Sequence, residues 1–318
     1  MELHTKYITS LFGFEAKKIT REKFGFLCKS DQAVVVMQKN HATEENLKSV
    51  LFQHEVKEHL HQAGFAKASR FLLTKENLPY HKTGGDFFTV VTASSAPLVD
   101  FTQKDQFLTV VESLGKMHKI LAGTQLNHKP KKQQDTISPE KDLVALAGYR
   151  KKLMKAGRFS EFDMLFLKAY EKSAPYISAW ESIPKDVLGN NNYICHNLLK
   201  EENIHMEDMP FFTNFFGCCY GHYLSDLVYI VKRYLKAEPE GVLPLADIFD
   251  AYKKGHPEAD LEQGFFATKL LYPNKLIRVV KDYYSKNHRF VPKAYLSRME
   301  ESLERAMVLE EYLQAQKR

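Results

Sequence analysis

The chain has 318 residues, which suits one large domain or two packed lobes and allows a sizeable buried core. Its composition, with 44% apolar and 26% charged residues, is that of a globular protein and favours neither a disordered nor a fibrous class. The net charge of +6 comes from 45 basic and 39 acidic residues spread along the chain, so nucleic acid is not an expected partner. The basic cluster from Lys129 to Lys132 is better explained as a solvated loop.

The N-terminal residues show no targeting segment. Residues 1–18 lack the continuous apolar core of a signal peptide, and no stretch approaches the roughly 18 apolar residues of a membrane span. We therefore expect a cytoplasmic protein without a membrane partner. Four cysteines in so long a chain do not form a disulfide framework, so they are expected to be reduced thiols.

The first third of the chain is predicted to be rich in strands. It contains two pairs of apolar, β-favouring runs, and each pair is separated by a short turn-forming segment. The turn segment is Asp31-Gln32 in the first pair and residues 81–85 in the second. The predicted strands are residues 24–30, 33–39, 70–77 and 86–94. Between the two pairs, residues 44–64 space their apolar side chains as a helix does and end in Gly64, which predicts a helix closed by a glycine.

The remainder of the chain is predicted to be mainly helical. Residues 104–123 carry an apolar stripe closed by another glycine, and residues 127–141 form a polar loop that contains proline. Further helical patterns cover residues 142–156, 160–182 and 261–316, the last of them interrupted at 272–275 and 287–293. A small antiparallel sheet followed by a helical body predicts an α+β protein with two lobes, residues 1–93 and residues 94–318.

Two short apolar runs interrupt the helical region, "NYICH" at residues 192–196 and "PFFTNFFG" at residues 210–217. In phosphotransferases with a kinase-like fold, a catalytic loop and a metal-binding strand stand in this place. One carboxylate there orients and deprotonates the attacking hydroxyl, and an asparagine on the same loop helps to bind Mg²⁺. A second carboxylate, on the next strand, holds the metal that bridges the phosphates.

The sequence resembles the aminoglycoside-phosphotransferase-like kinases and, within them, the CotS-like spore-coat-associated proteins of spore-forming bacteria. Those proteins carry "ICHGDxxxxN", then "IDFD", then "YG...DL". The corresponding segments here are "ESLGKMHK" (112–119), "ICHNLLKEEN" (194–203), "FTNFFGCCYGHYLSDL" (212–227) and a C-terminal helix (295–313). The resemblance extends from about Lys39 to the end of the chain, and it implies a two-lobed kinase-like fold.

The departures from the family pattern fall on the catalytic positions. Aligning on His196 places Asn197 at the family's glycine and Leu198 at its catalytic aspartate, while Asn203 is retained. Aligning on Tyr220-Gly221 places Asn214 at the metal-binding aspartate. Loss of a general base typically costs about 10²- to 10⁴-fold in rate, and an asparagine brings no charge to a metal. We therefore expect weak or absent ATP and Mg²⁺ binding and no cofactor.

A displaced acid would rescue the chemistry if the loop were shifted in register. The acids that lie nearby in the sequence are Glu201, Glu202, Glu207 and Asp208. Each would have to move by several residues to replace the missing base. Ordinary kinase turnover is therefore not expected, although residual activity stays open as an alternative.

The candidates for nucleotide binding are Asn203, which is retained in the loop, and two residues of the N-terminal region, Lys39 and Glu55. Lys39 ends a predicted strand where a kinase places its phosphate-binding lysine, and Glu55 or Glu58 on the next helix is the candidate ion-pair partner. The alternative is a surface lysine beside solvated helix charges. The preceding segment offers Gly25 alone rather than a glycine-rich loop, which argues against a phosphate cradle.

Other polar residues near the site are expected to be structural. The resemblance implies that His196 packs and hydrogen-bonds to hold the backbone of the loop. Asp226 stands where a helix begins, and we expect it to cap that helix or to brace the loop. Cys195, Cys218, Cys219 and His222 would surround the former active site, which raises zinc as an alternative, but their spacing matches no compact zinc motif.

The resemblance and its departures together favour a pseudokinase, a kinase-like protein without phosphotransferase activity that acts in interaction or assembly. The resemblance implies synthesis in the mother-cell cytoplasm and a place in the spore coat, with coat proteins as partners. One alternative is an atypical small-molecule kinase, of the aminoglycoside or choline type, that uses Asn203 and a displaced acid. Another is a sensor that binds a nucleotide or metabolite without turnover.

Overall fold

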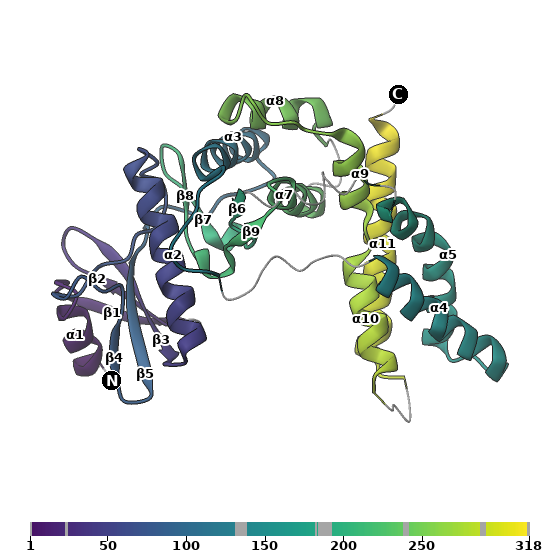
Figure 1. The fold of residues 1–318 in the computed structure, drawn as a ribbon, viewed down its shortest axis with the longest axis horizontal. Coiled ribbons are helices and arrows are strands. Elements are labelled where there is room, and N and C mark those ends of the chain that lie inside the picture. Colours follow the sequence, from purple (N-terminus) through teal and green to yellow (C-terminus); the bar gives the residue numbers. More distant parts are fainter. Residues whose placement is uncertain are drawn as a thin grey trace. The chain divides into compact units, whose positions relative to one another are not determined.

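The computed structural model describes residues 2–22, 25–130, 139–181, 183, 193–237, 242–286 and 291–316 (Figure 1). Two compact units divide the chain. The first unit contains Met1–Asp135, Asn190–Ile230 and Ala246–Ala259, and the second contains Thr136–Gly189, Val231–Leu245 and Asp260–Arg318. This division groups the predicted catalytic loop with the N-terminal sheet, so the lobe boundary at residues 93 and 94 stays a prediction.

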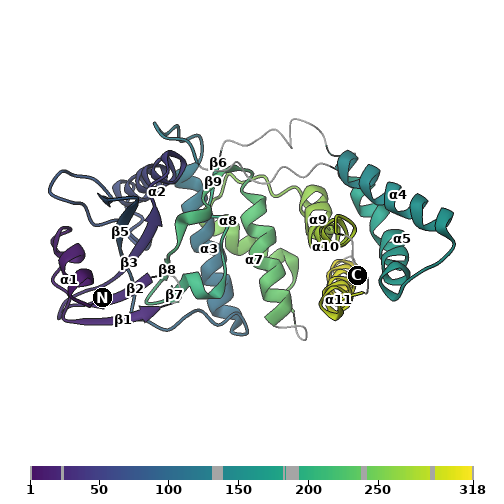
Figure 2. The same ribbon diagram turned by 90° about the horizontal axis from the view of Figure 1, so that it is seen from below.

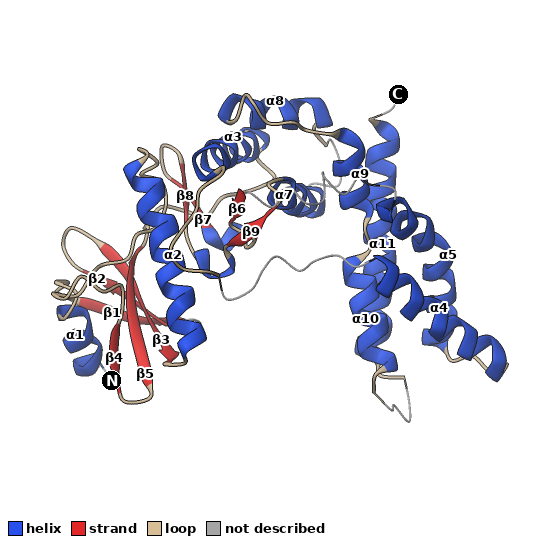
Figure 3. Cartoon of the chain, in the orientation of Figure 1, coloured by secondary structure: helices blue, strands red, loops and turns tan. Residues whose placement is uncertain are grey.

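A five-stranded antiparallel sheet forms the N-terminal part of the first unit (Figure 3). Its order is β1-β2-β3-β5-β4. The strands are β1 (Lys18–Glu22), β2 (Gly25–Lys29), β3 (Val34–His41), β4 (His81–Thr83) and β5 (Asp86–Thr92). The predicted hairpin is confirmed, because Phe26 pairs with Met37 and Cys28 with Val35 across β2 and β3. The sheet and the helices around it also confirm the α+β class.

The strand predicted at residues 70–77 is wrong. In this segment Phe71 forms an isolated bridge to Val91, and β5 pairs instead with the short strand β4. The backbone turns at Thr74, whose carbonyl accepts a hydrogen bond from the Asn77 N–H at 2.9 Å. Asn77 has a φ of 58°, which an extended strand does not allow. The turn residues therefore end the strand pattern early.

Two helices cover opposite faces of this sheet. Ile8 of α1 (Glu2–Ser10) belongs to a core cluster with Val35 and Met37 of β3. Val50 of α2 (Glu44–Gln62) belongs to a second cluster with Phe87 of β5. Successive strand residues point to opposite faces, so the sheet is apolar on both sides. The predicted helix at residues 44–64 is confirmed, whereas α1 was not predicted.

The rest of the first unit consists of short strands and helices. The strands form two antiparallel pairs, β6 (Tyr193–Cys195) with β9 (Cys219–Gly221) and β7 (Ile204–Met206) with β8 (Pro210–Phe212). Helices α3 (Lys104–Leu121) and α8 (Leu245–Gly255) pack closely, because a Cβ on Gly115 would collide with the Tyr252 carbonyl and one on Gly255 with the Glu112 carbonyl. Helix α7 (Leu224–Ala237) begins in this unit.

The second unit is helical. Its helices are α4 (Pro139–Ala156), α5 (Glu161–Glu181), α9 (Gln263–Leu271), α10 (Asn274–Tyr284) and α11 (Lys293–Ala315). Helices α4 and α5 lie side by side (Figure 2). Asp142 of α4 accepts hydrogen bonds from Tyr272 Oη at 2.6 Å and Lys281 Nζ at 2.5 Å. The predicted helices are confirmed, and residues 287–290 of the second predicted interruption lie outside the described residues.

Across the described residues, no helix combines the length and the apolarity needed to cross a bilayer. All four cysteines are buried thiols rather than halves of disulfides.

Candidate active-site region

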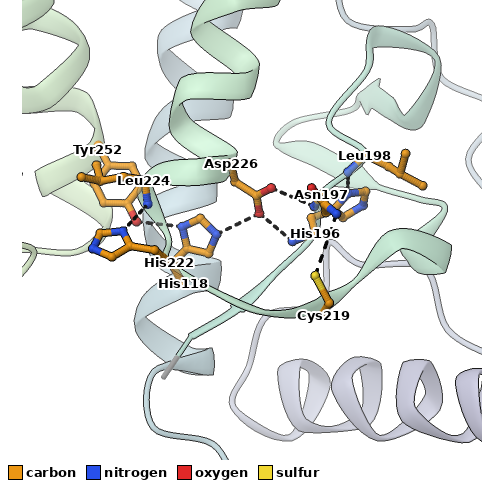
Figure 4. Close-up of polar contacts among 9 residues, drawn as sticks. All are labelled: His118, His196, Asn197, Leu198, Cys219, His222, Leu224, Asp226 and Tyr252. Atoms are coloured by element: carbon orange, nitrogen blue, oxygen red, sulfur yellow. Dashed lines mark hydrogen bonds and ion pairs between the residues drawn. The ribbon is translucent and has the colours of Figure 1, made fainter. Parts of the chain in front are cut away.

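A buried carboxylate holds the loop that follows β6. Asp226, in the first turn of α7, accepts hydrogen bonds from the backbone N–H groups of His196 at 2.6 Å and Asn197 at 2.8 Å (Figure 4). Its Oδ2 also lies 3.1 Å from His118 Nε2. Burial acts to raise the pKa of Asp226, but His118 and these N–H groups outweigh it and hold the pKa below its ordinary value. Asp226 therefore braces the loop as an ionised group.

His118 connects this carboxylate to α8. Its Nδ1 lies 2.7 Å from the Tyr252 hydroxyl, so the imidazole spans from Asp226 to Tyr252 across the helix contact made by Gly115 (Figure 4). The side chains of His118 and Asp226 are fully buried. Because both ring nitrogens have partners, His118 positions the carboxylate and has no free nitrogen for proton transfer.

His196 holds the loop in the same way. Its Nε2 lies 2.8 Å from the Thr213 carbonyl oxygen, and its Nδ1 accepts a hydrogen bond from the Leu198 N–H at 3.3 Å. The Thr213 carbonyl requires a proton on Nε2, so the neutral ring donates there and accepts at Nδ1. Burial lowers the pKa of His196 and favours this neutral form. These contacts serve the backbone and leave no ring nitrogen for catalysis.

The next residue in the loop has a left-handed backbone. Asn197 has a φ of 62°, a conformation that glycine and asparagine tolerate better than other residues. The alignment made from the sequence assigns it to the position of the family's glycine. A left-handed backbone at this position is one that glycine would also adopt without strain.

Leu198 stands at the expected position of the base, and its side chain is used for packing. A Cβ atom placed on Gly217 would lie 2.7 Å from Leu198 Cγ, so this side chain lies against the turn after β8. The Leu198 carbonyl accepts a hydrogen bond from Asn203 Nδ2 at 2.8 Å. The side chain can neither accept a proton nor hydrogen-bond an attacking hydroxyl.

The two asparagines at the expected metal positions contact each other. Asn214 Nδ2 donates a hydrogen bond to Asn203 Oδ1 at 3.1 Å. The backbone carbonyl of Asn203 accepts a second hydrogen bond, from the Thr213 N–H, at 2.9 Å. Asn203 ends the short 3₁₀ turn η1 (Glu201–Asn203), and Asn214 precedes η2 (Phe215–Gly217). Neither amide carries a charge. The oxygen that Asn203 would offer to a metal is already a hydrogen-bond acceptor.

The acids considered as displaced bases have other positions. Glu207 and Asp208 lie in the turn between β7 and β8, where both pair with Lys67, Glu207 at 3.0 Å. Glu202 lies 3.5 Å from Lys200. Two of the four candidate acids are therefore held by one lysine outside the loop that contains Leu198.

The predicted ion pair of Lys39 with Glu55 or Glu58 is wrong. Lys39 Nζ lies 2.8 Å from Asp86 on the neighbouring strand β5. Glu55 contacts His128 at 2.7 Å, and Glu58 receives a hydrogen bond from Arg70 at 2.7 Å. The alternation of β3 explains the error: Lys39 is on the same face as Val35 and Met37, which pack toward α1, whereas both glutamates are on α2.

The structure instead reveals a buried lysine that was not predicted. Lys57 of α2 is 2% exposed, and its Nζ lies 4.0 Å from the ring centroid of Phe71 and 5.5 Å from that of Phe215. In the described part of the chain, no hydrogen bond or ion pair joins this ammonium to another residue. Burial lowers its pKa to about 7.

The sequence did contain a signal for Lys57. The buried residues Val50, Gln53, Lys57 and Leu60 follow one another at helical spacing. A lysine in the middle of such a stripe is usually assigned to solvent because lysine is rarely buried without a partner. Position along the stripe, rather than residue type, is the better guide to burial here.

Cys195 and Cys219 are paired across β6 and β9, but the residues considered as the zinc alternative do not form one group of ligand atoms in the described part of the chain. Among the described residues, Cys195 groups with His118 and Asp226, with ligand atoms within 4.8 Å of one another, rather than with Cys218, Cys219 and His222. The hydrogen bonds of His118 and Asp226 to each other, to Tyr252 and to the loop give these two side chains a structural role.

Solved phosphotransferases share this fold. An aminoglycoside phosphotransferase from Alicyclobacillus acidocaldarius superimposes with a TM-score of 0.76 at 15% identity, covering 98% of this chain and 94% of that one. Spectinomycin phosphotransferase in complex with ADP and spectinomycin gives 0.63 at 14% identity, covering 96% and 98%. Amicoumacin kinase in complex with AMP-PNP and Ca²⁺ gives 0.65 at 11% identity, covering 98% and 93%. The chain therefore has the aminoglycoside-phosphotransferase-like, kinase-like fold.

A comparison with sequence models of protein families identifies the family of this chain. The chain belongs to the family described as "Spore coat putative kinase YutH", whose sequence model matches residues 5–316. Both the predicted fold and the predicted membership among spore-coat kinase-like proteins are confirmed. The comparison with curated proteins gives no match.

Proposed function

We propose that this protein is a kinase-like protein without phosphotransferase turnover, which acts in the spore coat by binding other proteins. The observation that carries the first part is the hydrogen bond between Asn214 and Asn203. In an active kinase-like site, a carboxylate and an asparagine hold the metal at these positions. Two neutral amides bonded to each other leave the phosphates without a charged metal ligand.

Leu198 supports the same proposal. A kinase-like site needs a group that accepts the proton of the attacking hydroxyl. Leu198 supplies none, and its side chain packs against Gly217 instead. The contacts of Glu207 and Asp208 with Lys67 weigh against a displaced acid as the base.

The family to which the chain belongs supports a proposal for where the protein acts. Membership in a spore coat family supports association with the coat, after synthesis in the mother-cell cytoplasm. A protein without turnover contributes to a coat through contacts, so its partners in this proposal are proteins of the coat.

The decisive experiment restores the two missing carboxylates. We expect no change in melting temperature when the natural protein receives Mg²⁺ and ATP. The double variant Leu198→Asp/Asn214→Asp should gain binding, and a ligand at a hundred times its dissociation constant adds about 2.7 kcal/mol of stability. The measurement is thermal unfolding with and without Mg²⁺-ATP, together with phosphoryl transfer to small-molecule acceptors.

A matched variant controls for added charge. Leu3→Asp/Asn77→Asp makes the same two replacements at exposed positions, where Leu3 is 84% exposed, and should leave the response to Mg²⁺-ATP unchanged. A Mg²⁺-dependent shift in the natural protein, or transfer of phosphate by it, would overturn the proposal. A shift with nucleotide but no transfer would identify the sensor alternative.

A further inference from the structure

The exposed face of α4 carries basic residues that have no ion-pair partner in the described parts of the chain. Lys151 and Lys155 are exposed and lie four residues apart on one side of the helix. In the described part of the chain, neither joins an ion pair, unlike Lys281, which binds Asp142. One and two turns before Lys151, the same stripe continues with exposed Ala147 and Gly148 and then with Val144, which is 73% exposed.

The middle of this stripe consists of small residues with open space beside them. A Cβ atom placed on Gly148 would meet nothing within 4 Å, and Ala147 beside it is also exposed. A large apolar side chain from a partner would fit against these two positions. The stripe thus presents two positive charges followed, one turn along, by a small-residue gap.

The outer face of α11 has the complementary pattern. Glu300 and Glu304 are exposed and four residues apart, and neither joins an ion pair with any residue that the structure describes, whereas Glu301 binds Lys275 at 2.6 Å. One turn further, Met307 and Val308 are 44% and 36% exposed. This stripe presents two negative charges followed by two large apolar side chains.

The two patterns match in spacing when the helices run antiparallel. The two lysines are four residues apart on α4, and the two glutamates are four residues apart on α11. In an antiparallel arrangement Lys155 therefore faces Glu300 while Lys151 faces Glu304. Continuing by three to four residues on both helices brings Met307 and Val308 onto Ala147 and Gly148. Large residues on one helix opposite small residues on the other allow close packing.

We propose that α4 of one molecule docks onto α11 of a second copy of the same chain. Charge complementarity selects this occupant, since both stripes belong to one protein and neither has an ion-pair partner among the residues that the structure describes. The contact joins two different surfaces, so it produces either a reciprocal dimer or an open chain of molecules. A contact between two single helix faces is expected to bury little area, so association should be weak and the associated fraction should rise with concentration. This contact between α4 and α11 does not depend on whether the protein has phosphotransferase turnover.

Sedimentation velocity of the whole protein over a range of concentrations tests this contact. The mean mass should rise with concentration at low salt and fall back at high salt, because exposed ion pairs are screened. Lys151→Glu/Lys155→Glu and Glu300→Lys/Glu304→Lys should each weaken association by more than about tenfold, since attraction becomes repulsion. Mixing the two variants should restore it, because the reversed α4 of one matches the reversed α11 of the other.

The control reverses two lysines of the neighbouring helix. Lys168→Glu/Lys172→Glu changes exposed residues four apart on α5 and should associate like the natural protein. Thermal unfolding checks that every variant is folded. A natural protein that stays monomeric at all concentrations, association unaffected by the α4 and α11 reversals, or a mixture that fails to associate would each overturn the proposal. None of these results depends on nucleotide binding.

Discussion

Replacement of Lys57 by methionine is expected to stabilise the protein at neutral and acidic pH, on the order of 3–5 kcal/mol. Methionine fills a similar space between Phe71 and Phe215 and has no charge to desolvate. The buried ammonium lacks a carboxylate partner among the described residues, and its contact with the Phe71 ring offsets part of the desolvation cost. Chemical unfolding of the natural protein and the variant measures the difference.

The pH dependence distinguishes this cause from better packing. Lys57 has a pKa of about 7 in the folded protein and an ordinary value of 10.5. Below pH 7 the amine is charged in both states, so the full desolvation cost is present. Between the two values the unfolded state binds more protons, so the stability of the natural protein rises with pH. The advantage of Lys57→Met should therefore shrink as pH rises from 7 toward 10.5.

Lys48→Met is the matched control on the same helix. Lys48 is exposed and pairs with Glu44, so its replacement should change stability by less than about 1 kcal/mol. Our account of Lys57 fails if Lys57→Met destabilises the protein, or if its effect is the same at every pH.

Replacement of Asp226 by alanine is expected to destabilise the protein by about 3–5 kcal/mol. The substitution leaves the N–H groups of His196 and Asn197 and the ring of His118 without their buried acceptor. The measurement is the free energy of unfolding in denaturant. Asp247→Ala is the control, because Asp247 lies exposed in the first turn of α8.

At low pH, most of the difference in unfolding free energy between the natural protein and Asp226→Ala should disappear. The pKa of Asp226 is held below its ordinary value of 3.8, so the carboxylate contributes its full stability above that value. As pH falls through the lower folded pKa, the carboxyl takes up a proton and the contribution is lost. A loss of stability as small as that of Asp247→Ala, or one that grows in acid, would contradict the role of Asp226 as an ionised brace.

Local patterns were sufficient for much of the fold. The hairpin of β2 and β3, helix α2 and the C-terminal helices follow from apolar spacing and from turn residues. The pattern failed at residues 70–77, where apolar residues precede a turn at Thr74 that ends the pairing. A short apolar run has the same appearance whether it continues as a strand or turns, because hydrogen bonds to other segments decide between them.

The contacts within the candidate site were harder to predict from the sequence than the fold. Motif order placed His196, Asn203 and Asp226 in one loop region, and the structure gives each of them contacts with that loop. The contact between Asn214 and Asn203 joins segments 11 residues apart, and only the folded backbone brings the two amides together. The partner of Lys39 was misassigned because the face of a strand on which a residue lies depends on its register.

The amide pair has a consequence for how the loop responds to its surroundings. A site that gathers carboxylates around a metal keeps its shape only while the ion offsets their mutual repulsion. Asn203 and Asn214 hold their two segments together by a hydrogen bond between neutral groups. We therefore expect the shape of this loop to be insensitive to chelators and to changes in the concentration of divalent cations.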